Sequence, residues 1–140
     1  MLYITKDDTV KEPVWSDPCY ILYTPSDFLG QTLSPGETIF IQTKIRFICT
    51  TSEYIEFKNT TLGFGLYVHN TILTSEHKDY FTEVAITNIS NENIWVKPLH
   101  PLCKILLRKK ENKDTTELTH VKERLDNNGY IQYEPIRKNP

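Results

Sequence analysis

Apolar and polar residues alternate with a period of two along most of the first 108 residues. β-Branched and aromatic side chains fill the apolar positions, and clusters of Gly, Pro, Asn, Asp and Ser separate the segments. A period of two places successive side chains on opposite faces of a strand, so this pattern predicts a β-rich protein. The expected strands cover residues 20–23, 38–48, 54–57, 65–68, 83–87, 94–96 and 102–108.

Two polar segments between these strands are typical of turns. Residues 34–37 (Ser-Pro-Gly-Glu) precede the longest expected strand, whose residues Ile39, Ile41, Ile45 and Phe47 share one face. Residues 88–93 consist of Asn, Ser and Glu around one isoleucine, which predicts a hairpin turn between strands 83–87 and 94–96.

The pattern changes after Arg108. Residues 109–114 form a charged run that has no apolar side chain to bury, so we expect a β-domain over residues 1–108 and a linker and tail over 109–140. Within the tail, Leu118, Val121 and Leu125 are three and four residues apart, and Asp114 and Glu117 resemble a capping box. Residues 114–125 therefore predict a short helix, with an extended arm as the alternative.

Composition limits the classes of function. A chain of 140 residues with 39% hydrophobic residues is one ordinary globular domain. Its formal net charge of −2 argues against general attraction to nucleic acid or anionic lipid. No stretch approaches the length of apolar sequence that a membrane span needs.

The cysteines and histidines indicate the compartment and the metal content. Cys19, Cys49 and Cys103 are far apart in apolar segments, which favours buried free thiols in an intracellular protein. The histidines and cysteines have no zinc-site spacing, so neither a metal nor another cofactor is expected.

Several motifs, taken in order, resemble the trimeric dUTPase family over residues 17–130. They are Cys-Tyr-Ile-Leu-Tyr-Thr (19–24), Leu-Ser-Pro-Gly-Glu (33–37), Ile-Gln-Thr-Lys-Ile-Arg-Phe (41–47), Asp-Tyr (79–80) and the segment from Lys97 to Ile-Leu-Leu (105–107). The resemblance implies an all-β fold of dUTPase type, a β-clip or distorted jelly-roll barrel with an extended or short-helical C-terminal tail. It also implies a homotrimer.

The chemistry of the family is not matched. The positions aligned with its functional residues are Ile21, Thr60, Thr61, His77, Tyr80, Lys104, Arg124 and Tyr130. Ile21 stands where the family has an acidic residue, and Thr60-Thr61 stands in place of Arg-Ser. Leu99 and His100 replace a glycine and an aspartate, and Lys104 replaces a glutamine that reaches the phosphates.

The catalytic base and the phosphate lid of the family are altered as well. The base position holds His77, whereas the sugar-contacting tyrosine is kept as Tyr80. The segment 124–130 keeps an arginine and an aromatic residue of the family's phosphate lid but only one glycine. The resemblance implies that hydrolysis by such enzymes needs an aspartate that activates water, a magnesium ion on the triphosphate, and hydrogen-bond donors that hold the phosphates. These differences predict a protein that is not an enzyme, with no catalytic residues.

We therefore expect a dUTPase-like protein that acts by binding other proteins. A narrower resemblance is to the dUTPase-derived early proteins of adenoviruses, based on residues 23–28 and 44–49. It implies a viral protein of the host cytoplasm or nucleus with an unidentified host or viral partner. Two alternatives stay open. One is a divergent nucleoside triphosphate pyrophosphatase with His77 as its base, and the other is a nucleotide-binding protein that uses Tyr80 and residues 63–65.

Overall fold

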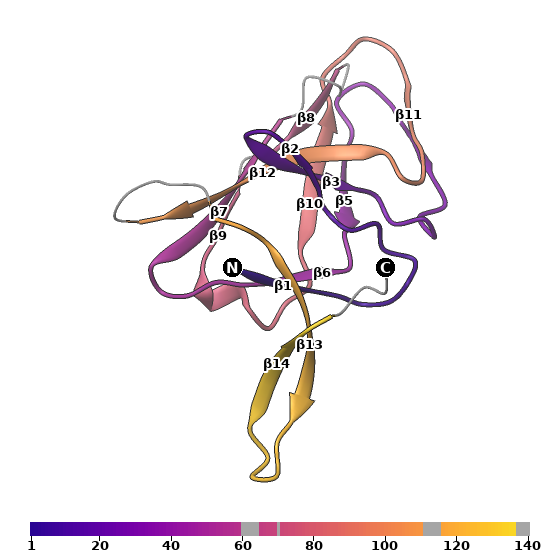
Figure 1. The fold of residues 1–140 in the computed structure, drawn as a ribbon. Coiled ribbons are helices and arrows are strands. Elements are labelled where there is room, and N and C mark those ends of the chain that lie inside the picture. Colours follow the sequence, from indigo (N-terminus) through magenta and orange to yellow (C-terminus); the bar gives the residue numbers. More distant parts are fainter. Residues whose placement is uncertain (60–64, 70, 111–115, 137–140) are drawn as a thin grey trace.

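A computed structural model of the chain describes residues 1–59, 65–69, 71–110 and 116–136. These residues form fourteen strands and one short 3-10 helix, which confirms the all-β fold class (Figure 1). The elements are β1 Leu2–Thr5, β2 Val14–Ser16, β3 Cys19–Tyr23, β4 Gln31–Leu33, β5 Thr38–Gln42, β6 Ile45–Ile48, β7 Glu53–Lys58, β8 Leu66–Val68, β9 Ile72–Leu73, η1 Ser75–His77, β10 Glu83–Asn88, β11 Ile94–Val96, β12 Pro101–Lys109, β13 Thr119–Leu125 and β14 Ile131–Pro135.

The largest sheet has five strands in the order β2-β3-β12-β7-β9, and all its neighbouring strands are antiparallel. One face is apolar and buried, because Leu22, Ile55, Phe57, Ile105 and Leu107 alternate with polar positions and are at most 1% exposed. This inner face forms much of the core. The opposite face carries Lys58 and Lys104 and is partly open to solvent.

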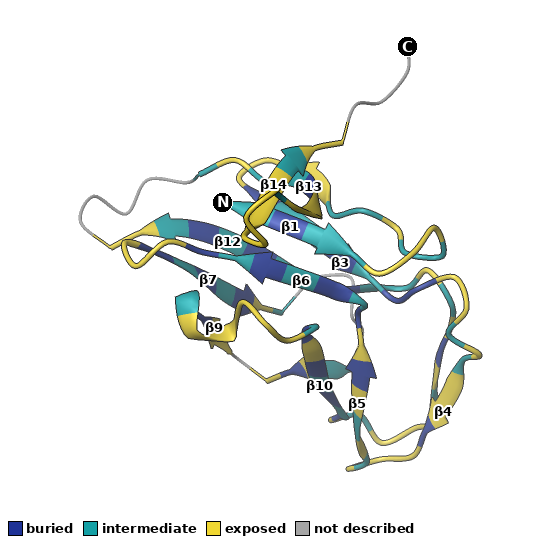
Figure 2. Ribbon diagram, turned by 90° about the horizontal axis from the view of Figure 1, so that it is seen from below, coloured by how far each residue is buried: buried dark blue, intermediate teal, exposed yellow. Residues whose placement is uncertain are grey.

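Three smaller sheets complete the core. Their orders are β14-β13-β1-β6, β5-β10-β8 and β11-β4, and β1 pairs in parallel with β13. Buried residues gather on the strands that face one another, whereas β14 is largely exposed (Figure 2). The described strands belong to these separate sheets and do not close into a single barrel.

The single strand expected over residues 38–48 is wrong. The chain forms β5 and β6, which belong to different sheets, and the break lies at Lys44, whose φ is 61°. Side chains satisfy the backbone at this break. The Gln42 Oε1 atom accepts from the Lys44 N–H at 3.0 Å, and the Thr43 hydroxyl donates to the Thr82 carbonyl at 2.8 Å.

The hairpin expected around residues 88–93 is also wrong. These residues do form a turn, but β10 pairs with β5 and β8, whereas β11 pairs with β4. The turn therefore connects two sheets. The buried Asn88 side chain organises it through four hydrogen bonds to Leu33, Ser90 and Glu92.

The helix expected over residues 114–125 is wrong in its described part, because residues 119–125 form the extended strand β13; residues 114 and 115 lie outside the described residues. β13 and β14 form a hairpin that projects from the rest of the chain (Figure 1). At its turn, the Asp126 Oδ1 atom accepts from the N–H groups of Asn128 and Tyr130, both at 2.9 Å, and Gly129 has a φ of 83°. The boundary at residue 108 stays a prediction.

The cysteines match the expected state of free thiols, since Cys19, Cys49 and Cys103 are all buried and unpaired. Burial raises the pKa of the Cys103 thiol to about 12 and that of Cys49 to about 11, where Glu53 adds to the effect. Among the described residues, no helix has the length and apolarity to cross a membrane.

Candidate functional site

Two of the sequence-predicted positions meet on the outer face of the five-stranded sheet. Ile21 on β3 lies directly opposite Lys104 on β12, and Lys104 lies opposite Lys58 on β7. Residues opposite each other in antiparallel strands have Cβ atoms about 5 Å apart. An apolar side chain and two ammonium groups therefore form one row across three strands.

The charges on this face are unbalanced. Beside the lysine pair, Glu56 forms ion pairs with the Arg108 guanidinium at 3.0 Å and with the Lys58 ammonium at 3.7 Å. One carboxylate thus serves two cations. Among the described residues, no carboxylate forms an ion pair with Lys104.

An open hollow lies next to this row. It has a volume of about 630 Å³ and is lined by Glu56, Phe57, Lys58, Asn59, Thr71 and Ile72. Ile72 is 57% exposed and gives the hollow an apolar wall. Pockets of 300–1,000 Å³ with an apolar lining and a few polar groups suit small ligands.

The loop before β12 has the backbone that a family glycine would supply. Leu99 has a φ of 55°, in the left-handed region that glycine adopts most easily. Its position matches the glycine of the resembled motif. The alignment of residues 97–104 stays a prediction.

His100 follows this turn in a half-buried place. Its N–H donates to the Thr24 hydroxyl at 2.7 Å, and that hydroxyl donates to the Lys97 carbonyl at 2.9 Å. Neither ring nitrogen has a hydrogen-bond partner within the described ranges. Burial and then the nearby Lys97 charge lower the pKa of His100, so the imidazole favours its neutral form.

His77 and Tyr80 lie at another part of the structure. His77 ends η1, which packs on β6, and its Nδ1 atom accepts from the Thr74 N–H at 3.0 Å. A neutral imidazole that accepts through Nδ1 carries its proton on Nε2. His77 is therefore a capping residue in this conformation and has no nitrogen ready to act as a base. Tyr80 is 70% exposed.

The remaining predicted positions do not join this row. Arg124 forms an ion pair with Glu134 at 2.7 Å on the polar face of the β13–β14 hairpin. Tyr130 lies at the hairpin turn and is 68% exposed. Thr60 and Thr61 lie outside the described residues. No result tests the roles given to any of these positions, so those roles stay predictions.

The residues of the row do not fit a magnesium ion. Mg²⁺ takes oxygen ligands such as carboxylates. Ile21 offers no oxygen, and the ammonium groups of Lys58 and Lys104 would repel a cation. The described part of the chain holds no cluster of three His, Cys, Asp or Glu side chains arranged for a metal.

Comparison of the whole fold with known structures gives a consistent result. A dUTPase variant from phage phi11 of S. aureus has a TM-score of 0.68 at 7% identity, over 82% of this chain and 94% of that one. The dUTPase of Streptococcus mutans has a TM-score of 0.62 at 10% identity, over 79% and 93%. A Staphylococcus bacteriophage 80alpha dUTPase variant with dUpNHpp has a TM-score of 0.66 at 9% identity, over 82% and 93%.

The fold is dUTPase-like. No protein-family model matches the sequence, and no curated protein matches it. The similar structures are enzymes, and this finding corrects the expectation that the chain is not an enzyme, because the fold points to an enzyme family.

Lys58 is the member of the row that the sequence interpretation missed. It ends β7, directly before the residues aligned with the Arg-Ser segment. Alternation along 53–58 places it on the polar face with Tyr54 and Glu56. That alternation does not show which residue of β12 lies opposite, because the sequence does not specify the register of two distant strands.

Proposed function

We propose that this chain is a divergent nucleotide-binding protein and nucleoside triphosphate pyrophosphatase of the dUTPase-like fold. The observation that carries the proposal is the row of Ile21, Lys104 and Lys58 beside an open hollow on this fold. The phage 80alpha dUTPase variant of the same fold was determined with dUpNHpp, a nucleotide. A similar class of ligand suits the hollow and its cationic edge.

The reaction in this proposal takes one water and one nucleoside triphosphate and yields a monophosphate and pyrophosphate. The chain's part is to hold the anionic phosphates next to Lys104 and Lys58. Cations placed where negative charge gathers stabilise the transition state of phosphoryl transfer. His77 has no place in this step because its Nδ1 atom caps η1.

The test combines binding and turnover. We expect dUTP or another nucleoside triphosphate to raise the melting temperature of the full chain, since a ligand at about 100 times its Kd adds about 2.7 kcal/mol. Pyrophosphate release should fall in Lys104→Gln and persist in His77→Ala. Lys122→Gln, on the distant hairpin, is the matched control. The proposal is refuted if neither stabilisation nor hydrolysis occurs with any nucleoside triphosphate.

A second candidate function is a protein-interaction or regulatory module, in keeping with the resemblance to adenovirus early proteins. Leu29 is 92% exposed and Phe40 72% exposed, and both line one open hollow. Trp95 packs its ring on Gly30 beside them. Large exposed apolar residues that gather in one place mark interaction surfaces.

This second candidate predicts loss of partner binding when the apolar side chains are removed. Phe40→Ser should reduce capture of a host or viral protein from infected cells, whereas Ile89→Ser, an exposed residue in the 88–93 turn, should not. Equal capture by both variants would contradict the assignment of this surface. An intracellular site of action, in the host cytoplasm or nucleus, belongs to the same proposal.

Self-association is the third part of the proposal, in the form of a homotrimer built by strand or tail exchange. One face of the β13–β14 hairpin carries Leu125, Ile131 and Tyr133, which are 67%, 53% and 37% exposed. A two-stranded hairpin alone is only marginally stable in water. Covering this face with another subunit would stabilise it.

Light scattering tests the assembly. We expect a mass of about three times the chain's 16.4 kDa. Ile131→Ser combined with Tyr133→Ser should shift the mass toward one subunit, whereas Gln132→Ser on the opposite face should leave it unchanged. A monomer at micromolar concentration in the unaltered protein would refute the homotrimer.

A further inference from the structure

We propose that Lys58 and Lys104 form a clamp for the polyphosphate of the ligand and hold it by direct charge, without a bridging divalent ion. This inference rests on the proposed nucleotide-binding function and specifies how the same site recognises its ligand. It assigns binding to Lys58 and Lys104. It also predicts that binding needs no divalent metal ion, and this second prediction can be tested separately.

The first argument is the strand register. Lys104 and Lys58 are directly opposite each other on β12 and β7. Like charges at directly opposed positions destabilise a sheet. An anion bound between the two ammonium groups would remove this repulsion, whereas the unliganded sheet has to tolerate it.

The second argument is the local shortage of negative charge. Glu56 is shared between Arg108 and Lys58, at 3.0 and 3.7 Å. Three cations on this face therefore face one carboxylate among the described residues, although the whole chain has a net charge of −2. A ligand with several negative charges in a short length, such as a polyphosphate, complements this surface.

The third argument is the mismatch with a metal. Ile21 flanks Lys104 on the side away from Lys58, so the row reads apolar, cationic, cationic. None of these three side chains offers the oxygen ligands that a divalent cation takes in proteins. The lysines supply the charge that neutralises the phosphates.

The hollow beside Lys58 gives the rest of the ligand a place. Ile72 is its exposed apolar member, and Asn59 and Thr71 are polar members of its wall. A phosphate chain on the lysines with an organic group in this hollow describes a nucleoside polyphosphate. Inorganic polyphosphate has the phosphate chain but lacks the organic group.

The experiment measures binding of inorganic tripolyphosphate, and separately of dUTP, by calorimetry in EDTA at an ionic strength of about 0.1 M, where screening acts beyond about 10 Å. We expect binding in EDTA. Lys104→Gln and Lys58→Gln should each weaken it at least about tenfold, the effect of losing one hydrogen bond to a charged group. Lys122→Gln removes one exposed positive charge elsewhere and should leave it unchanged.

The outcomes separate this inference from the proposed function. Nucleotide binding that requires Mg²⁺, or that is equal in Lys104→Gln and the unaltered chain, overturns the clamp and leaves the nucleotide function standing. Lysine-dependent binding of tripolyphosphate without binding of any nucleotide supports the clamp and refutes the nucleotide function. Absence of both kinds of binding overturns both.

A second readout needs no ligand. Because the lysines repel each other, Lys58→Gln should leave the melting temperature of the unliganded protein unchanged or raise it slightly. A clear fall in melting temperature in both lysine variants would show that the ammonium groups stabilise the fold, and it would overturn the argument from opposed charges.

Discussion

Replacing Asn88 tests how the sheets are held together. Its side chain is fully buried and makes four hydrogen bonds. The Nδ2 atom donates to the carbonyls of Leu33 and Glu92 at 2.9 and 2.7 Å, and the Oδ1 atom accepts from the N–H and hydroxyl of Ser90 at 2.9 and 2.7 Å. One amide thus connects β10, β4 and the 88–93 turn.

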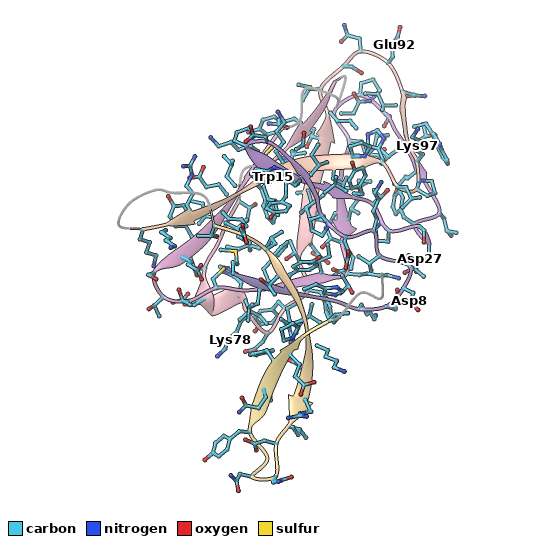
Figure 3. The ribbon with its side chains drawn as sticks, viewed as in Figure 1. Asp8, Trp15, Asp27, Lys78, Glu92 and Lys97 are labelled. Carbon is cyan, nitrogen blue, oxygen red and sulfur yellow. The ribbon has the colours of Figure 1, made fainter. Side chains whose placement is uncertain are left out.

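The expected magnitude follows from these bonds. A buried hydrogen bond contributes about 0.5–1.5 kcal/mol net, so four lost bonds correspond to about 2–6 kcal/mol. The lower half of this range applies to Asn88→Ala, because the Ser90 hydroxyl has a single proton and can donate it to the carbonyl of Glu92 (labelled in Figure 3), 2.9 Å away, once the Asn88 Oδ1 atom is removed. We expect a loss of about 3 kcal/mol in the free energy of unfolding.

The assay is urea denaturation at fixed protein concentration, which keeps any effect of self-association constant. Asn91→Ala, an exposed residue of the same turn, is the matched control and should change the free energy by less than about 0.5 kcal/mol. Equal and small effects of both substitutions would refute the role of the Asn88 amide.

Asn88→Asp tests the two hydrogen bonds that the Asn88 Nδ2 atom donates. The carboxylate keeps the acceptor for Ser90 but places oxygen against the carbonyls of Leu33 and Glu92. Burial disfavours the charged form, so the pKa of this aspartate should rise above its usual range. The loss in the free energy of unfolding, relative to the unaltered protein, should therefore be larger at pH 7 than at pH 4.5, because protonation of the aspartate restores one hydrogen-bond donor.

Two further predictions concern titrating groups. The pKa of His100 is lowered in the fold, so the unfolded chain binds this proton more readily. The free energy of unfolding should therefore fall as pH decreases below about 6.5. His100→Gln should reduce this fall, as measured by melting temperature from pH 7.5 to 5.5. Burial raises the pKa of Cys103 to about 12 and of Cys49 to about 11, so both thiols should react with a thiol reagent at pH 8 only after denaturation. Rapid reaction of Cys103 in the folded protein would contradict its burial.

The sequence predicted best where a short run of β-branched and other apolar residues lies between turn residues. The segment 94–96 matches β11, and 102–108 lies within β12, although alternation in 102–108 is interrupted at Leu102-Cys103 and at Leu106. The same pattern did not predict the break between β5 and β6 at Lys44. Its positive φ occurs at a residue that is neither Gly nor Asn, and polar side chains from Gln42 and Thr43 replace the missing ladder bonds.

The apolar residues of the tail fit both the helical period and the strand period. Leu118, Val121 and Leu125 match a helical spacing, but Val121 and Leu125 also share one face of a strand. The deciding signal was Asn128-Gly129, a strong turn signal for hairpins. In the family resemblance, the same residues align with a glycine-rich segment of which only Gly129 remains.

The candidate site could be predicted only in part, because it depends on strand register. Ile21 and Lys104 are identifiable from the resembled motifs, but their contact with Lys58 follows from pairing between β12 and β7, which are more than forty residues apart. Register is set by core packing over the whole sheet, and short motifs carry little information about it.

Two features near β12 are unfavourable in the unliganded chain. Leu99 has a left-handed backbone, and a non-glycine residue in this region costs about 1 kcal/mol or more. The turn that contains Leu99 precedes β12, the strand that carries Lys104. The second feature is the pair of opposed lysines, Lys58 and Lys104, which repel each other when no anion lies between them. A bound anion would offset this repulsion, and the tripolyphosphate measurement tests whether one binds there.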